Sequence, residues 1–131
     1  MTEFVDTSAF FALLDADDHN RDRARTHLRD VIDGGIGLLT HEYVVVESTA
    51  LIQRRLGLEA LRRFVDDLLP VVEVAWVDEE LHREAREALL AAGRRTVSLV
   101  DWTSFLVMRR HGVSAFIGQD EHFAREGFSR P

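Results

Sequence analysis

Acidic side chains are the residues of this chain best suited to carry chemistry. Asp6 ends one short apolar run, Asp120 follows another, and Asp101 stands in the first turn of a helical pattern. Glu47 lies on a half-apolar face of a further helical pattern. Four carboxylates that converge with no lysine to neutralise them repel one another, so a divalent cation is their natural counter-charge. Because oxygen-only ligands select Mg²⁺ or Mn²⁺, these four acids form a candidate metal site with catalytic potential.

Each of these acids also has a purely structural explanation. Asp6-Thr7-Ser8 could supply capping groups at the end of a strand, and Ser98 with Asp101 fits a capping box. Asp120 could cap the short helix that follows it, and Glu47 could face solvent. Spacing alone does not establish the cluster. The joint placement of the four at one edge of the expected sheet favours a shared site.

The elements that would position these acids alternate between strands and helices. Strands are expected over 3–6, 37–40, 71–77 and 113–117, and a last edge strand over the segment that begins at Phe128. Helices are expected over 9–14, 42–56, 58–69, 79–92, 99–111 and 121–126, with a charged helix from His19-Asn20 that has Ala24, Leu28, Val31 and Ile32 on one face. This alternation predicts an α/β fold with a parallel sheet between helices, whose ligands bind at the carboxyl edge of the strands.

Length and composition exclude many classes of protein. A chain of 131 residues fits a single domain over residues 1–131, with no internal repeat. The absence of cysteine excludes disulfides, thiolate zinc sites and cysteine nucleophiles, and all 16 basic residues are arginine, which excludes lysine chemistry. The net charge of −7 argues against a generic nucleic-acid coat protein. We find no signal peptide and no apolar run long enough for a membrane span, so we expect a cytoplasmic protein without a membrane partner.

Four motifs occur in the order and at the length of a known family. They are Asp6-Thr7-Ser8, Glu47 in the run 47–57, Ser98-Leu99-Val100-Asp101, and Asp120-Glu121-His122-Phe123 followed by Gly127-Phe128. Together they resemble PIN-domain ribonucleases, and most closely the VapC-like toxins of toxin–antitoxin pairs. Each motif is weak alone, whereas four in order, with Arg109-Arg110-His111-Gly112 before the last, are specific.

The resemblance implies a parallel sheet of about five strands between helices, a Mg²⁺ or Mn²⁺ site, and endonucleolytic cleavage of RNA. Its four acids fall on Asp6, Glu47, Asp101 and Asp120, with Asp6, Glu47 and Asp101 expected to be essential. The accompanying small hydroxyl residue falls on Thr7 or Ser8. One departure is Gly118, where the family often has threonine, and it leaves the role of Asp120 open.

The resemblance also implies partners. An antitoxin would cover the acidic site, and a homodimer would form through helices of the first half, for which Leu51, Ile52, Leu56, Leu58 and Leu61 could serve either as interface or as core. RNA needs positive charge beyond the metal ions, and the candidates are Arg54, Arg55, Arg62, Arg63, Arg109 and Arg110. These arginines could equally lie on solvated helix faces with acid partners four residues away, or meet acidic groups of a partner.

Other functions fit the sequence less well. A non-catalytic PIN-like module that binds RNA or protein is the main alternative, although all four acidic positions are filled. A response-regulator receiver domain would need a lysine, which the chain lacks. A phosphatase on a similar sheet would want a second acid two places after Asp6, where Ser8 stands.

Overall fold

One parallel sheet forms the centre of the computed structural model, which describes every residue of the chain except Asn20. Over the described residues its strands are β1 (Thr2–Val5), β2 (Gly37–His41), β3 (Glu73–Ala75) and β4 (Ala115–Ile117). Their order is β3-β2-β1-β4, and every neighbouring pair is parallel. The carboxyl ends of all these strands therefore lie along one edge, with β1 and β4 adjacent.

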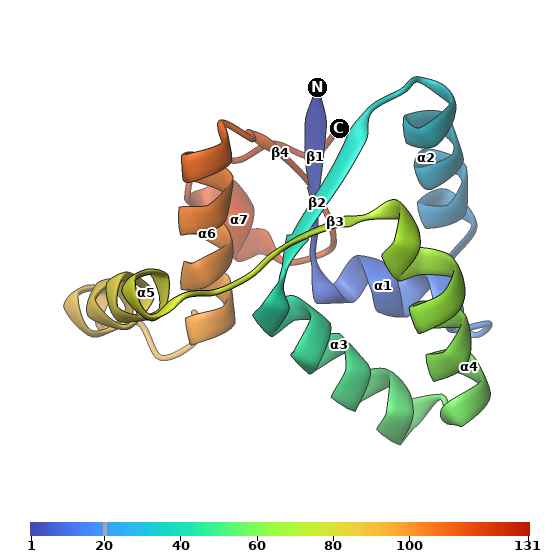
Figure 1. Cartoon of the computed structure of the whole chain (residues 1–131), viewed down its shortest axis with the longest axis horizontal. Coiled ribbons are helices and arrows are strands. Elements are labelled where there is room, and N and C mark those ends of the chain that lie inside the picture. The colour runs from blue at the N-terminus through green and yellow to red at the C-terminus, as the bar shows by residue number, and fades with distance from the viewer. Residues whose placement is uncertain (20) are drawn as a thin grey trace.

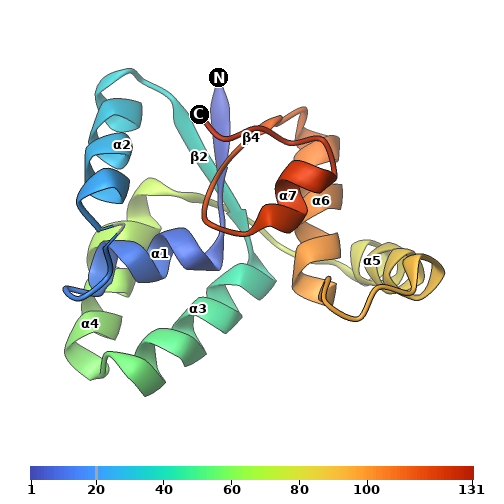
Figure 2. The same cartoon turned by 180° about the vertical axis from the view of Figure 1, so that it is seen from behind.

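Helices cover both sides of this sheet. They are α1 (Thr7–Leu14), α2 (Arg21–Asp33), α3 (Glu42–Arg55), α4 (Leu58–Arg63), α5 (Glu79–Ala92), α6 (Leu99–His111) and α7 (Glu121–Arg125). Figures 1 and 2 show α1, α2 and α4 on one side of the sheet and α5, α6 and α7 on the other, with α3 running below the carboxyl edge. This arrangement confirms the α/β fold class.

Aromatic side chains fill the core between the sheet and α6 and α7. Phe4 at the centre of β1 is fully buried, and its ring stacks 5.9 Å from that of Phe123. Phe123 in turn stacks on Phe116 at 4.8 Å and meets Phe105 edge-on at 5.1 Å. The sheet and α6 are thereby fixed to the short helix α7, which isolated would be too short to be stable.

The sheet has fewer strands than the sequence suggests, and β3 and β4 are shorter than expected. The segment at Phe128 forms only an isolated bridge, between Ala115 and Ser129, in place of a fifth strand. The Phe128 ring packs 5.8 Å from Phe105, so this segment is held by aromatic packing and not by a ladder of backbone hydrogen bonds. The described residues thus form a sheet of four strands, one fewer than the approximate number predicted.

The expected helix over 58–69 is irregular in its second half. Regular helix ends at Arg63, and a π-helical turn (η1, Phe64–Leu68) and a 3₁₀ turn (η2, Leu69–Val71) follow. Pro70 lacks a backbone N–H and restricts the residue before it, which ends the helix and delays β3 to Glu73. The π turn leaves Phe64 fully buried, with its ring 5.1 Å from that of Phe10.

The expected inner face of the charged helix is correct except for one residue. In α2, Val31 is buried, whereas Ile32 is 48% exposed. Adjacent helical residues point about 100° apart, so both could not face the same core. The helix begins at Arg21, and the part of the prediction that concerns Asn20 lies outside the described residues.

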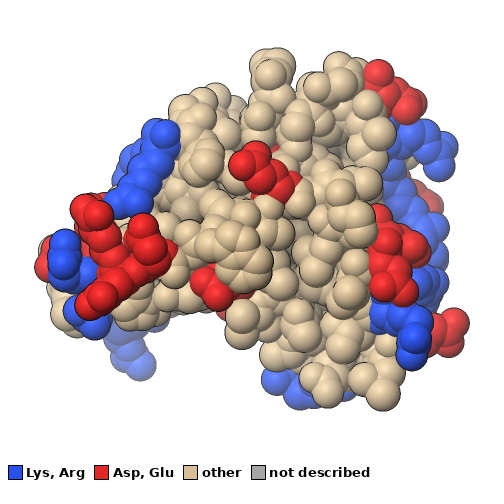
Figure 3. Space-filling model, in the orientation of Figure 1, with Lys and Arg blue, Asp and Glu red and all other residues tan. Residues whose placement is uncertain are grey.

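Charge is distributed over the flanks of the molecule. Figure 3 shows arginine and acidic side chains gathered together over α5 on one flank and over α2 and α4 on the other, with a largely uncharged centre. Because basic and acidic side chains are mixed on both flanks, this face has no continuous basic surface. Among the described residues, no helix is long and apolar enough to cross a membrane.

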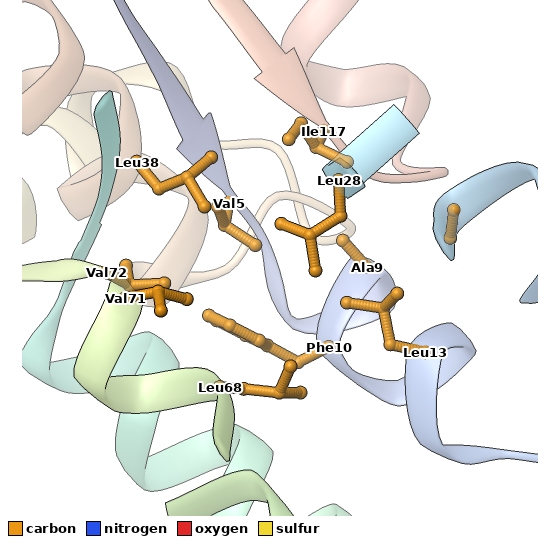
Figure 4. A pocket seen from close by; sticks show the side chains of 11 residues that line it. Val5, Ala9, Phe10, Leu13, Leu28, Leu38, Leu68, Val71, Val72 and Ile117 are labelled. Carbon is orange, nitrogen blue, oxygen red and sulfur yellow. The ribbon is translucent and has the colours of Figure 1, made fainter. Parts of the chain in front are cut away.

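A small apolar cavity lies between α1, α2, η2 and the sheet. Its lining includes Val5, Phe10, Leu28 and Val72, and every labelled side chain in Figure 4 is hydrocarbon. Its volume of about 10 Å³ is close to the minimum for one water molecule. With no polar group to orient a ligand, it is a packing defect of the core.

Candidate metal and nuclease site

Asp6 stands where β1 ends and α1 begins. Its backbone N–H donates to the carbonyl of Ile117 in β4 at 3.1 Å, which ties the two central carboxyl ends together. Asp6 is the N-cap residue of α1, yet its side chain makes no capping hydrogen bond. The residue is only 6% exposed, so a buried acid is left available for another role.

The electrostatic environment of Asp6 is strongly unfavourable to its charge. Burial raises the pKa of Asp6 to about 7, and repulsion from Asp101, Asp120 and Glu47 adds to the increase. A backbone hydrogen bond from Thr7 offsets part of this effect on the pKa. The structure therefore brings all four predicted acids near enough to interact. A buried carboxyl whose main neighbours are other carboxylates is typical of a functional site.

Asp101 is held by the capping box predicted from the sequence. The Ser98 hydroxyl accepts from the Asp101 N–H at 3.1 Å, and the Asp101 carboxylate accepts from the Ser98 N–H at 3.0 Å. Burial raises the pKa of Asp101 to about 6, with added repulsion from Asp120. The structural and functional explanations of Asp101 thus both apply: one oxygen caps α6 while the carboxyl faces the other acids.

The remaining two acids are less buried and hydrogen-bonded differently. Asp120 caps α7 by accepting the N–H of His122 at 2.9 Å. Glu47 is exposed on α3, and its carboxylate accepts a hydrogen bond of 2.7 Å from the Thr7 hydroxyl. This hydrogen bond joins α1 to α3 and holds Glu47 at the solvent-exposed side of the acidic cluster. The hydroxyl of Thr7 therefore positions Glu47, a pairing that sequence spacing did not reveal.

A buried histidine fixes α3 relative to α6. His41 caps α3 by accepting the Tyr43 N–H, and its Nε2 lies 2.8 Å from the Ser104 hydroxyl. Because Ser104 donates to the Val100 carbonyl at 2.9 Å, Nε2 must carry the hydrogen of a neutral ring. Burial lowers the pKa of His41 to about 3, which keeps it neutral. The helices that carry Glu47 and Asp101 are joined through this bond.

Ser8 fills the space that the missing side chain at Gly118 leaves open. Its hydroxyl accepts the Gln119 N–H at 2.9 Å and lies 3.5 Å from Asp6 Oδ2. A Cβ atom at Gly118 would stand 2.9 Å from this hydroxyl and 3.1 Å from the Asp6 Cβ. Of the two candidates for the hydroxyl beside the first acid, Ser8 of α1 is therefore the one that lies next to Asp6.

We predict that Gly118→Ala lowers the free energy of unfolding by roughly 1–3 kcal/mol, because the new methyl group overpacks Ser8 and Asp6. Urea denaturation of purified protein measures this change. In a Ser8→Ala background the same Gly118→Ala change should cost less, since the closer of the two contacts is then absent. Equal stability of Gly118→Ala and the wild type would show that this close approach is not a constraint.

A second prediction concerns the cap of α6. Ser98→Ala removes the acceptor for the Asp101 N–H, and we expect a loss of about 1 kcal/mol in the free energy of unfolding. Thr26→Ala, at an exposed position inside α2, serves as a matched control that changes no cap. If both variants unfold at the same denaturant concentration as the wild type, the capping box contributes nothing measurable.

The four acids are chemically suited to bind a divalent cation, but they lie too far apart to form a ready-made site. Four carboxylates supply only oxygen ligands, and no cationic side chain is among the main causes that set the pKa values of Asp6 and Asp101 in the described structure. Nevertheless, no three His, Asp or Glu side chains among the described residues are already close enough to form a metal-binding group. Joint binding of one ion by three of these carboxylates would therefore require them to move closer together.

The arginines proposed for RNA contact divide into two groups. Arg109 donates to Glu126 at 3.1 Å, and Arg110 donates to Glu84 at 2.7 Å, so this pair is engaged with acids of other helices. The second group, for which no such ion pair is found within the described structure, consists of Arg54, Arg55, Arg62 and Arg63. Arg109 and Arg110 therefore have acid partners, but these lie 17 and 26 residues away and not at the expected spacing of four residues.

Comparisons with known proteins agree on one relationship. A family profile described as "PIN domain" matches residues 4–128. The chain is 34% identical over 126 residues to the 23S rRNA-specific endonuclease VapC20 of Mycobacterium tuberculosis, with 95% of this chain and 94% of the relative covered.

Solved structures extend the comparison. The crystal structure of VapC20 from M. tuberculosis, described as a Sarcin-Ricin loop cleaving toxin, superposes with a TM-score of 0.83 at 32% identity, covering 98% of this chain and 96% of the other. FitAcB from Neisseria gonorrhoeae gives a TM-score of 0.69 at 16% identity, covering 100% and 97%. VapBC2 from Rickettsia felis, bound to a DNA fragment from their promoter, gives 0.71 at 13% identity, covering 95% and 92%. The last two likenesses concern the fold alone.

Proposed function

We propose how this chain cuts RNA, starting from one premise: the chain belongs to the PIN-domain family and is an endoribonuclease of the VapC toxin type. Nucleases of this family generally depend on divalent metal ions. One observation carries the proposal for the site. The buried carboxyl of Asp6, with a pKa of about 7, faces Asp101, Asp120 and Glu47 at the carboxyl edge of β1 and β4.

The four acids have different roles in this proposal. Asp6 and Asp101, the two buried carboxyls, would bind Mg²⁺ or Mn²⁺ directly. Glu47, fixed by the Thr7 hydroxyl, would bind the same ion or orient the attacking water. Asp120 would hold a second ion or act through water. When bound, the ion lowers the pKa of a coordinated water and neutralises charge that builds on the phosphate oxygens.

The reaction is hydrolysis of an RNA phosphodiester. A bond forms from a water oxygen to phosphorus, one phosphorus–oxygen ester bond breaks, and the leaving oxygen takes up a proton. Glu47 at the mouth of the site can accept a proton from the water, since it is the most exposed of the four acids. Ser8 and Thr7 keep Asp6 and Glu47 in position through their hydroxyl groups.

The substrate we propose is 23S ribosomal RNA, and specifically its sarcin–ricin loop. The similarity to VapC20 supports this choice, because it extends over 95% of this chain at 34% identity. We further propose that residues 1–131 act as one domain in the cytoplasm. A cognate antitoxin would cover the acidic site, and an arginine placed among the carboxylates would compete with the metal ion.

A homodimer through α3 and α4 completes the proposal. Leu58 in α4 is 68% exposed and Val46 in α3 is 62% exposed, so both have apolar area to bury. Ile52, which the sequence left open between interface and core, is fully buried and belongs to the core of the protomer.

The test is cleavage of ribosomes and of purified 23S rRNA by antitoxin-free protein, with primer extension to map the ends. We expect one discrete cut in the sarcin–ricin loop with Mg²⁺ or Mn²⁺ and none with EDTA. Glu73→Gln, which removes an exposed acid on β3 away from the cluster, should cut like the wild type. Cleavage at other sites would overturn the substrate, and no cleavage of any RNA by folded protein would favour a non-catalytic binding module.

A further inference from the structure

A groove lies beside the acidic site, on the face shown in Figure 2 where α1, α2, β4 and the C-terminal segment meet. Its volume is about 310 Å³. Part of its lining consists of small side chains, which leave room that larger ones would fill. These are Ala9, Ala12 and Ala24. This volume lies at the lower end of the range for small-molecule sites, roughly 300 to 1,000 Å³.

The permanently charged side chains that line this groove are two arginines. Arg23 and His27 come from α2 and Arg130 from the C-terminal segment, and no acidic residue lines it. In a chain with a net charge of −7, such a groove is a local exception. His27 Nε2 lies 2.9 Å from the Glu3 carboxylate, so the positive charge that the groove offers to a ligand comes from Arg23 and Arg130.

The two arginines are available in different ways. Arg23 is exposed, and no ion pair is found for it within the described part of the chain. Arg130 lies over the Phe116 ring at 5.6 Å and donates from Nε to the Gly118 carbonyl at 3.2 Å. Its other contact is an ion pair of 3.0 Å with Glu121, whose side chain is 67% exposed. An exposed pair of this kind is weak and can be exchanged for a stronger anion.

The floor of the groove is shared with the acidic site. Gly118 and Gln119 line the groove, and Gly118 also approaches Asp6 so closely that a Cβ would stand 3.1 Å from the Asp6 Cβ. The Gln119 N–H is bonded to Ser8, the same hydroxyl that lies beside Asp6. An RNA strand bound at Asp6 must extend beyond the acidic site. The four carboxylates repel every phosphate that no metal ion neutralises, so neighbouring phosphates are better bound by the adjacent basic groove.

We propose that this groove binds the backbone phosphate of a nucleotide next to the cleaved bond, with Arg23 and Arg130 as its ligands. The inference rests on the proposed ribonuclease function and adds a substrate contact to it. Guanidinium groups match phosphate oxygens through paired N–H donors, which suits both arginines to this role. Neither of them belongs to the arginine pairs that sequence patterns bring to attention, since neither has an arginine next to it in the sequence.

The first test uses Arg23→Gln, Arg130→Gln and the double variant in cleavage of an oligoribonucleotide that contains the mapped site. We expect kcat/KM to fall roughly tenfold for each single variant. The slope of log(kcat/KM) against log salt should become shallower by about 0.7 for each lost phosphate contact. Arg86→Gln, an exposed arginine on α5, is the matched control and should change neither quantity. Thermal unfolding of each variant checks that the fold is intact.

The second test locates the contact on the RNA. Each phosphate near the cleaved bond is replaced in turn by an uncharged methylphosphonate. In the wild type, one replacement beside the cleaved bond should reduce kcat/KM about tenfold, and in the double variant the same replacement should have little further effect. Equal losses in wild type and variant at every position would overturn the proposal, even if Arg130→Gln alone disturbed the C-terminal segment.

The outcomes separate this inference from the proposed function. If the wild type cuts no RNA, the ribonuclease proposal fails, and this inference fails with it. If the wild type cuts RNA and the arginine variants cut equally well with the same salt slope, only the groove proposal fails. Should those variants instead weaken binding of the cognate antitoxin while cleavage is unchanged, the groove is a protein contact and the RNA assignment is wrong.

Discussion

Asp6→Asn is expected to reduce metal-dependent RNA cleavage by at least about 10²-fold while making the metal-free protein more stable at pH 8. Loss of a group that only supports metal ligands already costs about 10- to 100-fold, so loss of a proposed direct ligand should cost more. The gain in stability has a separate cause. At pH 8 the wild type must keep Asp6 ionised although it is buried among Asp101, Asp120 and Glu47, and the amide carries no charge to bury.

Two measurements on the same protein check this prediction. Cleavage rates at saturating Mn²⁺ give the first effect, and urea denaturation in EDTA gives the second. Asp30→Asn, at an exposed position on α2, is the control for loss of one negative charge. A variant that loses activity and also loses stability would indicate that Asp6 is mainly structural. One that keeps both wild-type activity and Mn²⁺ affinity would remove Asp6 from the site.

The position of the acids was predictable because it depends on topology more than on detail. Once β1 and β4 are parallel neighbours, Asp6 and Asp120 must emerge at the same sheet edge. The capping box that holds Asp101 was predictable for another reason: it depends only on two residues three positions apart, Ser98 and Asp101. Sequence patterns of short range, combined with one rule about strand connections, were thus sufficient to bring these three acids to one edge.

What escaped prediction depends on contacts between distant parts of the chain. The Thr7 hydroxyl meets Glu47 across two helices, and the Ser8 hydroxyl meets the backbone at Gln119, separations of 40 and 111 residues. Before the fold is known, nothing in the sequence decides between Thr7 and Ser8 as the hydroxyl that supports the first acid. In the structure the Ser8 hydroxyl lies beside Asp6, whereas the Thr7 hydroxyl donates to Glu47, so Ser8 takes that role and Thr7 positions another acid.

The contribution of Asp6 to the free energy of unfolding of the metal-free protein is expected to fall as pH rises from about 4 to about 7. Its pKa is near 4 in the unfolded chain and about 7 in the folded protein. Between these values the folded state binds more protons than the unfolded state, so stability decreases with rising pH. Asp101, with a folded pKa of about 6, acts in the same direction over a narrower range. For one group the limit is about 1.4 kcal/mol per pH unit.

His41 opposes this trend and makes a difference measurement necessary. Its pKa is lowered to about 3 in the folded protein, so the unfolded chain binds more protons below about pH 6.5 and stability rises with pH there. Urea denaturation in EDTA at several pH values, for wild type and Asp6→Asn, removes the His41 contribution because both proteins contain it. The stability of wild type relative to the variant should fall steadily from pH 4 to 7.

Added Mn²⁺ provides the last step of this test. At pH 7.5 the ion should restore stability to the wild type and not to Asp6→Asn, because binding to the folded state raises its free energy of unfolding by mass action. A constant difference between the two proteins across the pH range would mean that Asp6 titrates near its ordinary value. Asp6 would then be solvated in the metal-free state, and repulsion within the cluster could not be what drives metal binding.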